Sequence, residues 1–270
     1  QILNNQDPLQ YTISYYENET EAESGINPIG NPQAFANTNS FNQMIWIRVE
    51  DNMSLANCYK LISLELIVNS LPVLISPSPL DLCNINGLNN GQEPFILEDA
   101  NITILNGQTG ISLSYHETQL DADSGSNPIF SPYTNIANPQ TLFVRGENDI
   151  TGCFSTTTLT LRVNPIPSPQ SNPEPIEICD DDNDGFAEFD LEIRTADITN
   201  GEPNVTITYH DTQTDAEMGD NPIIGLYTNI VANTQMIYVR SENILTGCYS
   251  LTQNVLELIV KPTPIVPVTI

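Results

Sequence analysis

The sequence predicts an all-β protein made of tandem immunoglobulin-like β-sandwich domains, each with a short helical turn between strands. One segment occurs three times, at residues 14–29, 114–129 and 208–223. Its tyrosines Tyr15, Tyr115 and Tyr209 are spaced by 100 and 94 residues. A period of this length is the size of one small domain. About seven short strands with turn signals in each period favour a sandwich.

In each period, the repeated segment contains the end of a strand followed by a helical turn. Residues 11–16 alternate as a half-buried strand does. A capping residue, an acid three positions later and a glycine stop then predict a helix of one or two turns. The three sets are Asn18, Glu21 and Gly25; Thr118, Asp121 and Gly125; and Thr212, Asp215 and Gly219. An irregular acidic loop is the alternative.

Two stronger strands complete each period. The first covers residues 44–50, 141–147 and 236–242, and the closing strand covers 62–68, 156–163 and 255–260. In the first of these, an arginine precedes a glutamate by two positions, so both side chains share one face. We interpret Arg48, Arg145 and Arg240 as members of surface ion pairs of little energetic value.

Proline-containing linkers mark the domain boundaries, because proline cannot donate to a β-ladder and favours an extended connection. They follow the closing strands at 69–72, 164–167 and 261–264. Residues 1–5 match 103–107, so the first third of the first domain is expected to be missing. The expected domains are 1–70 (incomplete), 73–165 and 170–262, with 263–270 as a linker or the start of a next unit.

Composition excludes several classes of function. Seven Lys plus Arg face 34 Asp plus Glu, giving a net charge of −27. Such a surface repels nucleic acid and anionic membranes, and no apolar run is long enough for a direct membrane span. The composition suits an extracellular protein and offers oxygen ligands to divalent cations. No organic cofactor is expected.

The five cysteines form two series. Cys58, Cys153 and Cys248 are 95 residues apart, and Cys83 and Cys179 are 96 apart. The simplest pairing is one disulfide per domain, Cys83–Cys153 and Cys179–Cys248, formed in an oxidising compartment. Cys58 would then pair with a cysteine upstream of the sequence. Free thiols in a cytosolic protein are the alternative. Metal ligation is disfavoured because no two cysteines are close in sequence.

An acidic turn is the best candidate metal site. Asp180, Asp182 and Asp184 occupy alternate positions before Gly185, as in the opening of a calcium loop, and Asp190 could complete the ligands. Leu191 stands where an EF-hand would need glutamate. A solvated acidic turn is the alternative. The second period has amides there, including Asn84, so any ion would bind it weakly.

Apparent catalytic motifs do not persist between the periods. Asp123-Ser-Gly resembles an aspartic-protease loop, but its counterparts at 23–25 and 217–219 do not. His116 and His210 are replaced by Tyr16 in the first period. We therefore expect no catalytic residues and no enzyme activity.

The sequence also resembles a known group of repeats. The ordered motifs are those at 179–191, 207–216, 238–243 and 246–249, with their copies. They are similar to the repeats of giant Bacteroidota cell-surface adhesins of the gliding-motility, SprB-like kind. The resemblance implies export by the type IX secretion system and attachment at the outer-membrane cell surface.

We accordingly expect structural stalk repeats of a long filamentous adhesin involved in surface attachment and gliding motility. The expected partners are neighbouring repeats of the same chain, extracellular polysaccharide or surfaces, and a cell-surface motility track. The alternative is a glycan- or protein-binding immunoglobulin-like module of a secreted surface protein. That alternative needs repeated exposed aromatics, for which Tyr133 and Tyr227 are the candidates.

Overall fold

The computed structural model describes residues 2–3, 7–54, 56, 58–88, 90–251 and 255–264. Residues 265–270 of the expected terminal linker, and parts of the 1–5 match, lie outside the described residues. By contacts the chain forms two compact units. One holds residues 1–74, 107–113 and 145–156, and the other holds 75–106, 114–144 and 157–270. We call 1–70, 73–165 and 170–262 the first, second and third repeats.

The first repeat is built on one antiparallel three-stranded sheet. Its strand order is β1-β2-β3, so β3 is an edge strand. The elements are β1 (Tyr11–Tyr16), α1 (Glu19–Ser24), the 3-10 turn η1 (Pro32–Ala34), β2 (Asn42–Asp51) and β3 (Tyr59–Ile67).

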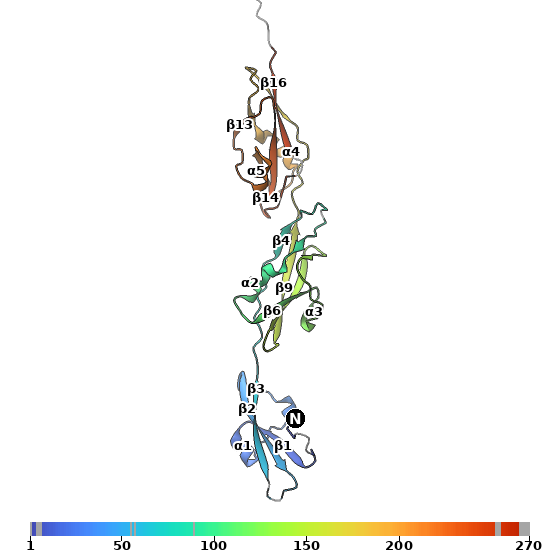
Figure 1. The fold of residues 1–270 in the computed structure, drawn as a ribbon, viewed down its shortest axis with the longest axis vertical. Coiled ribbons are helices and arrows are strands. Elements are labelled where there is room, and N and C mark those ends of the chain that lie inside the picture. The colour runs from blue at the N-terminus through green and yellow to red at the C-terminus, as the bar shows by residue number, and fades with distance from the viewer. Residues whose placement is uncertain are drawn as a thin grey trace, which may run out of the picture. The chain divides into compact units, whose positions relative to one another are not determined.

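The second repeat has a four-stranded sheet of order β4-β9-β8-β6 and a two-stranded sheet of β5 and β7 (Figure 1). Its first strand, β4, pairs in parallel with its last, β9. The strands are β4 (Leu80–Cys83), β5 (Pro94–Phe95), β6 (Ile111–His116), β7 (Tyr133–Thr134), β8 (Gln140–Asn148) and β9 (Phe154–Asn164). The helices are η2 (Leu97–Ala100), α2 (Asn101–Leu105) and α3 (Gln119–Ser124).

The third repeat follows the same plan. Its larger sheet has the order β10-β16-β14-β12, with β15 paired to β14, and β11 pairs with β13. The strands are β10 (Ile176–Asp180), β11 (Glu188–Asp190), β12 (Val205–His210), β13 (Leu226–Thr228), β14 (Thr234–Asn243), β15 (Tyr249–Ser250) and β16 (Val255–Pro262). The helices are η3 (Leu191–Arg194), α4 (Thr195–Thr199) and α5 (Gln213–Met218).

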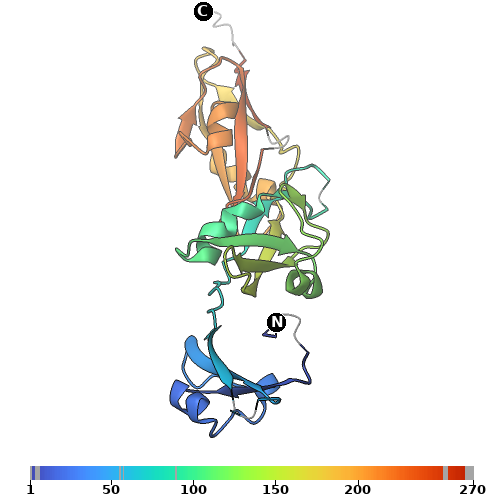
Figure 2. The ribbon, with the colours of Figure 1, turned by 60° about the horizontal axis from the view of Figure 1, so that its bottom comes forward.

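The predicted fold class is confirmed: the chain is a tandem array of immunoglobulin-like β-sandwiches with short helices between strands (Figures 1 and 2). The second predicted feature, the helical turn, is also present. In α5 the Thr212 hydroxyl accepts the Asp215 N–H at 3.1 Å, and Gly219 ends the helix in the left-handed region at φ 73°. The pairs η2–α2 and η3–α4 were not predicted.

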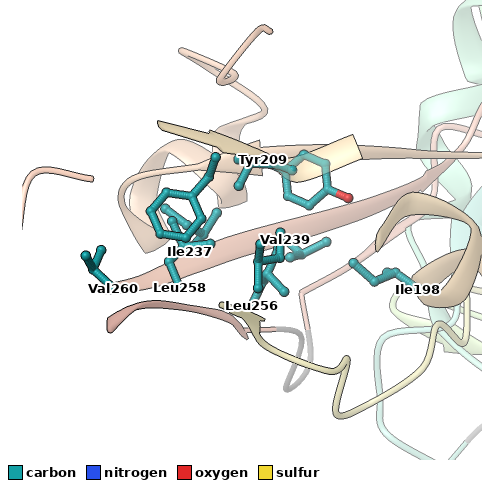
Figure 3. Close-up of a cluster of buried hydrophobic side chains, with 10 residues drawn as sticks. Ile198, Tyr209, Ile237, Val239, Leu256, Leu258 and Val260 are labelled. Carbon is teal, nitrogen blue, oxygen red and sulfur yellow. The ribbon is translucent and has the colours of Figure 1, made fainter. Parts of the chain in front are cut away.

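Alternating residues of the strands fill the core of the third repeat (Figure 3). Ile237 on β14 and Leu256 on β16 are opposite each other and fully buried. Phe189 of β11 and Ile198 of α4 also lie in this core. The first third of the repeat therefore supplies a large part of its apolar packing, which stabilises the fold in proportion to the area removed from water.

Candidate functional site: a disulfide between repeats

One disulfide joins the second repeat to the third. Cys83 is bonded to Cys248, with an S–S distance of 2.08 Å and a Cα–Cα distance of 5.5 Å. The two residues are 165 positions apart in sequence. The predicted pairings Cys83–Cys153 and Cys179–Cys248 are therefore wrong.

The sheet topology explains why a repeat cannot close its own disulfide. In the third repeat, Cys179 is opposite Lys261, near the end of β16. Cys248 is instead next to Asn243, whose N–H donates to the Cys248 carbonyl at 2.9 Å. Those positions lie at opposite ends of the ten-residue β14, which places them roughly 30 Å apart. A disulfide needs Cα atoms within about 7 Å of each other.

Parallel pairing with the closing strand holds Cys83 at the end of its repeat. β4 runs beside β9, and Cys83 is opposite Asn164, the residue that leads into the linker. Asp81 forms an ion pair with Arg162 across the two strands at 2.5 Å. The hydrogen bond from Arg162 keeps the pKa of Asp81 below its ordinary value. The first cysteine of a repeat thus faces the repeat that follows.

A tight turn after β14 holds Cys248. The Asn243 side chain accepts the N–H groups of Leu245 and Thr246 at 3.0 and 3.3 Å. Gly247 has φ 71°, a conformation that favours glycine. The Cys248 N–H donates to the Thr246 hydroxyl at 3.3 Å, and Cys248 is fully buried.

A buried arginine fixes the residue that follows this cysteine. Arg240 donates to the Ala216 and Glu217 carbonyls at the end of α5, at 3.0 and 2.9 Å. Its guanidinium also bonds the Glu242 carboxylate and lies 3.6 Å from the centroid of the Tyr249 ring. Hydrogen bonds and a cation–π contact together tie α5, β14 and β15 to one side chain.

The same arginine stack occurs in every repeat. Arg48 lies 3.5 Å from the Tyr59 ring and Arg145 lies 3.4 Å from the Phe154 ring. The interpretation of these arginines as surface ion pairs was incomplete. Arg240 is only 8% exposed, and its carbonyl and ring contacts could not be inferred from a two-residue spacing.

The acidic turn after Cys179 is organised around one buried carboxylate. Asp180 accepts the N–H groups of Asn183 and Gly185, each at 2.7 Å. Burial opposes its ionisation, but these two hydrogen bonds together with those from Asp182 lower the pKa of Asp180. Asp180 therefore holds the two ends of the turn together.

The other predicted calcium ligands are distributed differently. Asp180, Asp181 and Asp182 bring carboxylate oxygens within 4.8 Å of one another. Asp184 instead accepts the Phe186 N–H at 2.8 Å, and Asp190 caps η3 by accepting the Glu192 N–H at 3.1 Å. The cluster that could hold a cation thus includes Asp181, which the alternating pattern passed over.

Like charges affect Asp182. The Asp184 N–H favours its ionised form, but burial and the neighbouring carboxylates of Asp184 and Asp180 together raise the pKa of Asp182. A divalent cation would relieve this repulsion, and so would protonation.

A different carboxylate closes the matching turn in the second repeat. Glu93, which is buried, accepts the N–H groups of Ile85 and Asn86 at 2.7 and 2.9 Å. The carboxylate comes from the end of this turn, whereas Asp180 comes from the beginning. Each turn holds one buried acid, which indicates a structural role for Asp180.

A family model described as the Flavobacterium inter-domain disulphide bond domain matches residues 1–72, 79–167 and 175–264. The chain belongs to this family. Its description agrees with the Cys83–Cys248 bond between two of the matched repeats. A search of curated proteins found no match.

Solved structures with low similarity share the tandem arrangement. The titin I-band fragment I67–I69 is 10% identical, covers 96% of this chain and 89% of its own, and has a TM-score of 0.35. Drosophila OTK extracellular domains 3–5 are 11% identical, cover 96% and 88%, and have a TM-score of 0.32. Domains 7–9 of the S-layer protein SbsC are 12% identical, cover 94% and 81%, and have a TM-score of 0.29. Scores this low say nothing about function.

The other three cysteines of the chain are free thiols: Cys58, Cys153 and Cys179. Cys58 and Cys179 are exposed and Cys153 is half-buried. Cys153 ends the same kind of turn as Cys248: its carbonyl accepts the Asn148 N–H, and Gly152 has φ 68°.

The histidines of the repeated segment have structural contacts. His210 is fully buried, with Nδ1 2.8 Å from the Asp220 carbonyl and Nε2 2.9 Å from the Thr208 hydroxyl. His116 makes the corresponding contacts with Ser126 and Ser114. Both rings join the strand to the segment after the helix.

The tyrosines considered for ligand binding are half-buried and hydrogen-bonded. Tyr133 donates to Glu117 at 3.0 Å and accepts from Gln140 at 2.8 Å. Tyr227 donates to Asp211 and accepts from Gln235 at 2.7 Å. These networks hold the loop before β8 or β14, so they do not favour the glycan-binding alternative.

Among the described residues, no helix is long and apolar enough to cross a membrane.

Proposed function

We propose that this chain is a load-bearing stalk segment of a long filamentous cell-surface adhesin, with repeats at 1–70, 73–165 and 170–262. The Cys83–Cys248 bond between consecutive repeats carries the proposal. Its work is mechanical and not enzymatic. The family match and the immunoglobulin-like repeats support this class of function.

The position of the disulfide determines how tension would pass through the chain. Tension entering at β4 reaches Cys83, crosses the disulfide to Cys248 and leaves through β16. All residues between the two cysteines lie inside the covalent loop. Residues 84–247, which make up most of the second and third repeats, cannot then be drawn out by force at the ends. The tension also does not pass through the linker between the two repeats.

The same pattern of pairing predicts a partner for each of the three free thiols. The first cysteine of each repeat would bond the second cysteine of the next repeat. Cys179 would then pair with a cysteine in a following repeat, and Cys153 with the first cysteine of the first repeat. Cys58 would pair with a repeat before that. A continuous ladder of overlapping loops would limit extension of the whole array.

The same features support a proposal for the cellular setting. Disulfides persist in oxidising compartments, so the repeats are assigned to the outside of the cell. We propose export by the type IX secretion system of a Bacteroidota bacterium, attachment to polysaccharide or other surfaces, and a role in gliding. Antibodies against the chain should label intact cells. Label that appears only after permeabilisation would contradict this location.

Force spectroscopy tests the mechanical proposal. The full chain is pulled from its two ends, oxidised and then reduced. The oxidised chain should withhold a loop of 165 residues, which corresponds to roughly 550 Å of extended chain. Reduction should release that length.

The control is a chain carrying both Cys83→Ser and Cys248→Ser, which should extend fully without reductant. Equal lengths for the oxidised and reduced wild-type chain would contradict the proposal. So would two separate withheld loops of about 70 residues, which disulfides within single repeats would produce.

We also propose that calcium binds the Asp180 turn and stiffens the start of the third repeat. The support is the cluster of Asp180, Asp181 and Asp182, whose carboxylate oxygens lie within 4.8 Å of one another. Titration calorimetry with calcium should give a heat that Asp182→Asn abolishes. An absence of heat, together with a melting temperature that chelation leaves unchanged, would refute calcium binding.

A further inference from the structure

The two cysteines of the disulfide between repeats differ in their access to solvent. Cys248 is 0% exposed, whereas Cys83 is only half-buried. Both values describe the bonded pair, which is the state that an external thiol would meet. A thiolate attacks a disulfide at a sulfur that it can reach. The difference in burial therefore bears on which of the two sulfurs exchanges with other thiols.

The chain around Cys248 turns its side chain away from solvent. Tyr249 is 38% exposed, whereas Cys248 and Ser250 on either side of it are buried, as expected where side chains alternate between two faces. The turn fixes this orientation. The Cys248 N–H donates to the Thr246 hydroxyl, and the Cys248 carbonyl accepts the Asn243 N–H. A thiol that attacked the Cys248 sulfur would have to displace packed side chains.

Cys83 lies instead at the open edge of a sheet. β4 is the outermost strand in the order β4-β9-β8-β6, so among the described strands it has a neighbour on one side only. The residues before Cys83 are accessible too: Leu82 is 36% exposed, and the Asp81 side chain is 40% exposed. Asp81 is paired with Arg162 of the closing strand. A thiol can therefore approach the Cys83 sulfur from the side of β4 that carries no strand.

Burial also affects the step that follows the attack. A thiol that attacks Cys83 expels the sulfur of Cys248 as a thiolate, and a buried site disfavours the charged form of a thiol. The expelled sulfur stays beside the new mixed disulfide, so its return attack on Cys83 has the advantage of proximity. The mixed disulfide is therefore short-lived, and the bond between the repeats resists reduction.

We propose that Cys83 is the exchange site of this disulfide and that Cys248 is the resolving cysteine. The partner is a dithiol–disulfide oxidoreductase of an oxidising compartment. Because a reaction and its reverse share one path, formation of the bond passes through the same mixed disulfide on Cys83. The assignment rests on the Cys83–Cys248 bond of the proposed function.

The proposed formation has two steps. The Cys83 thiolate attacks the oxidoreductase disulfide, a bond forms between Cys83 and one enzyme sulfur, and the second enzyme sulfur leaves as a thiolate. The Cys248 thiolate then attacks the Cys83 sulfur and releases the first enzyme sulfur. In total, two electrons and two protons pass from the two cysteines to the enzyme. The enzyme thus holds the earlier repeat while the later repeat closes the bond.

Exchange with reduced glutathione tests the assignment on the oxidised full chain. Cys58, Cys153 and Cys179 are first blocked with N-ethylmaleimide. Samples taken during the reaction are quenched with acid, which protonates thiolates and stops exchange. They are then digested with pepsin and mapped by mass spectrometry. Glutathione should be found on Cys83 in at least about tenfold excess over Cys248, which corresponds to about 1.4 kcal/mol.

Two controls separate burial from the local sequence around each cysteine. In urea, where the chain is unfolded, glutathione should be found on Cys83 and Cys248 in comparable amounts. A chain carrying Cys248→Ser lacks the resolving sulfur. After reduction and addition of oxidised glutathione, it should keep glutathione on Cys83, whereas the wild-type chain should gain glutathione there and then lose it.

The outcomes distinguish this assignment from the proposed function. Glutathione on Cys248 of the folded chain, in an amount equal to or larger than on Cys83, would overturn it. So would a disulfide that glutathione opens only in urea, since neither sulfur would then be reachable in the fold. If mapping before the reaction finds no Cys83–Cys248 bond, the proposed function fails together with this assignment. A bond that is present and exchanges equally at both sulfurs overturns the assignment alone.

Discussion

Cys83 and Cys248 are bonded although each repeat contains another cysteine that is closer in sequence. Cys83 ends β4 beside the closing strand, and Cys248 ends the turn that follows β14. The first and second cysteines of a repeat are therefore at opposite ends of its sheet. Only cysteines of consecutive repeats can meet.

Arg240→Lys should weaken the third repeat and loosen the turn that holds Cys248. Lysine cannot make the forked bonds to Glu242 and the α5 carbonyls together with the stack on Tyr249. We expect a loss of about 2 kcal/mol in unfolding free energy and faster reduction of the disulfide by dithiothreitol. The matched control is Arg162→Lys, whose side chain is half exposed. Equal effects of the two changes would contradict the role given to Arg240.

Phe189→Ala should cost about 3–5 kcal/mol, because a fully buried ring leaves a cavity. Hydrogen exchange of the β14 and β16 amides measures the loss in the full chain. Phe186→Ala is the control, since Phe186 is 41% exposed and three residues away. A similar loss of protection in both variants would show that the core assignment is wrong.

Gly146→Ala should disturb the linker between the first and second repeats. A Cβ atom at Gly146 would lie 2.7 Å from a Leu74 methyl carbon, so Leu74 must move. We expect a destabilisation of about 1 kcal/mol and faster proteolysis near Val73. Gly30→Ala has no atom within 4 Å of the added Cβ and should have no such effect. Unchanged proteolysis of the Gly146 variant would argue against this packing.

Protonation of Asp180 and protonation of Asp182 should change the stability of the fold in opposite directions. The pKa of Asp180 is lowered from 3.8, so its contribution to stability is complete above pH 3.8 and is lost as the pH falls through the folded-state value. The pKa of Asp182 is raised from 3.8, so its ionisation at neutral pH opposes folding. At pH 7 without calcium, Asp180→Asn should lower the melting temperature and Asp182→Asn should raise it. Carbon-13 NMR should show Asp182 protonating before Asp180 as acid is added, and the reverse order would contradict the assignment.

Local patterns in the sequence were enough to predict the three longest strands of each repeat and the capped helices. Thr212, Asp215 and Gly219 act within a few residues of each other, so their spacing alone determines the helix ends. The partner of Cys83 depends on the parallel pairing of β4 with β9, a contact between distant strands that no local pattern reports. The stack of Arg240 on Tyr249 was not predicted for the same reason. In the acidic turn, the alternating pattern indicated Asp184, and Asp190 was expected to complete the ligands. Both side chains instead bond nearby N–H groups.

The central claim is that the disulfide joins consecutive repeats. Free thiols are blocked with an alkylating reagent, and the oxidised chain is digested and mapped by mass spectrometry without reduction. We predict a linked pair of peptides containing Cys83 and Cys248. Alkylated Cys58, Cys153 and Cys179 should appear in separate peptides. Linked peptides containing Cys83 with Cys153, and Cys179 with Cys248, would contradict the account.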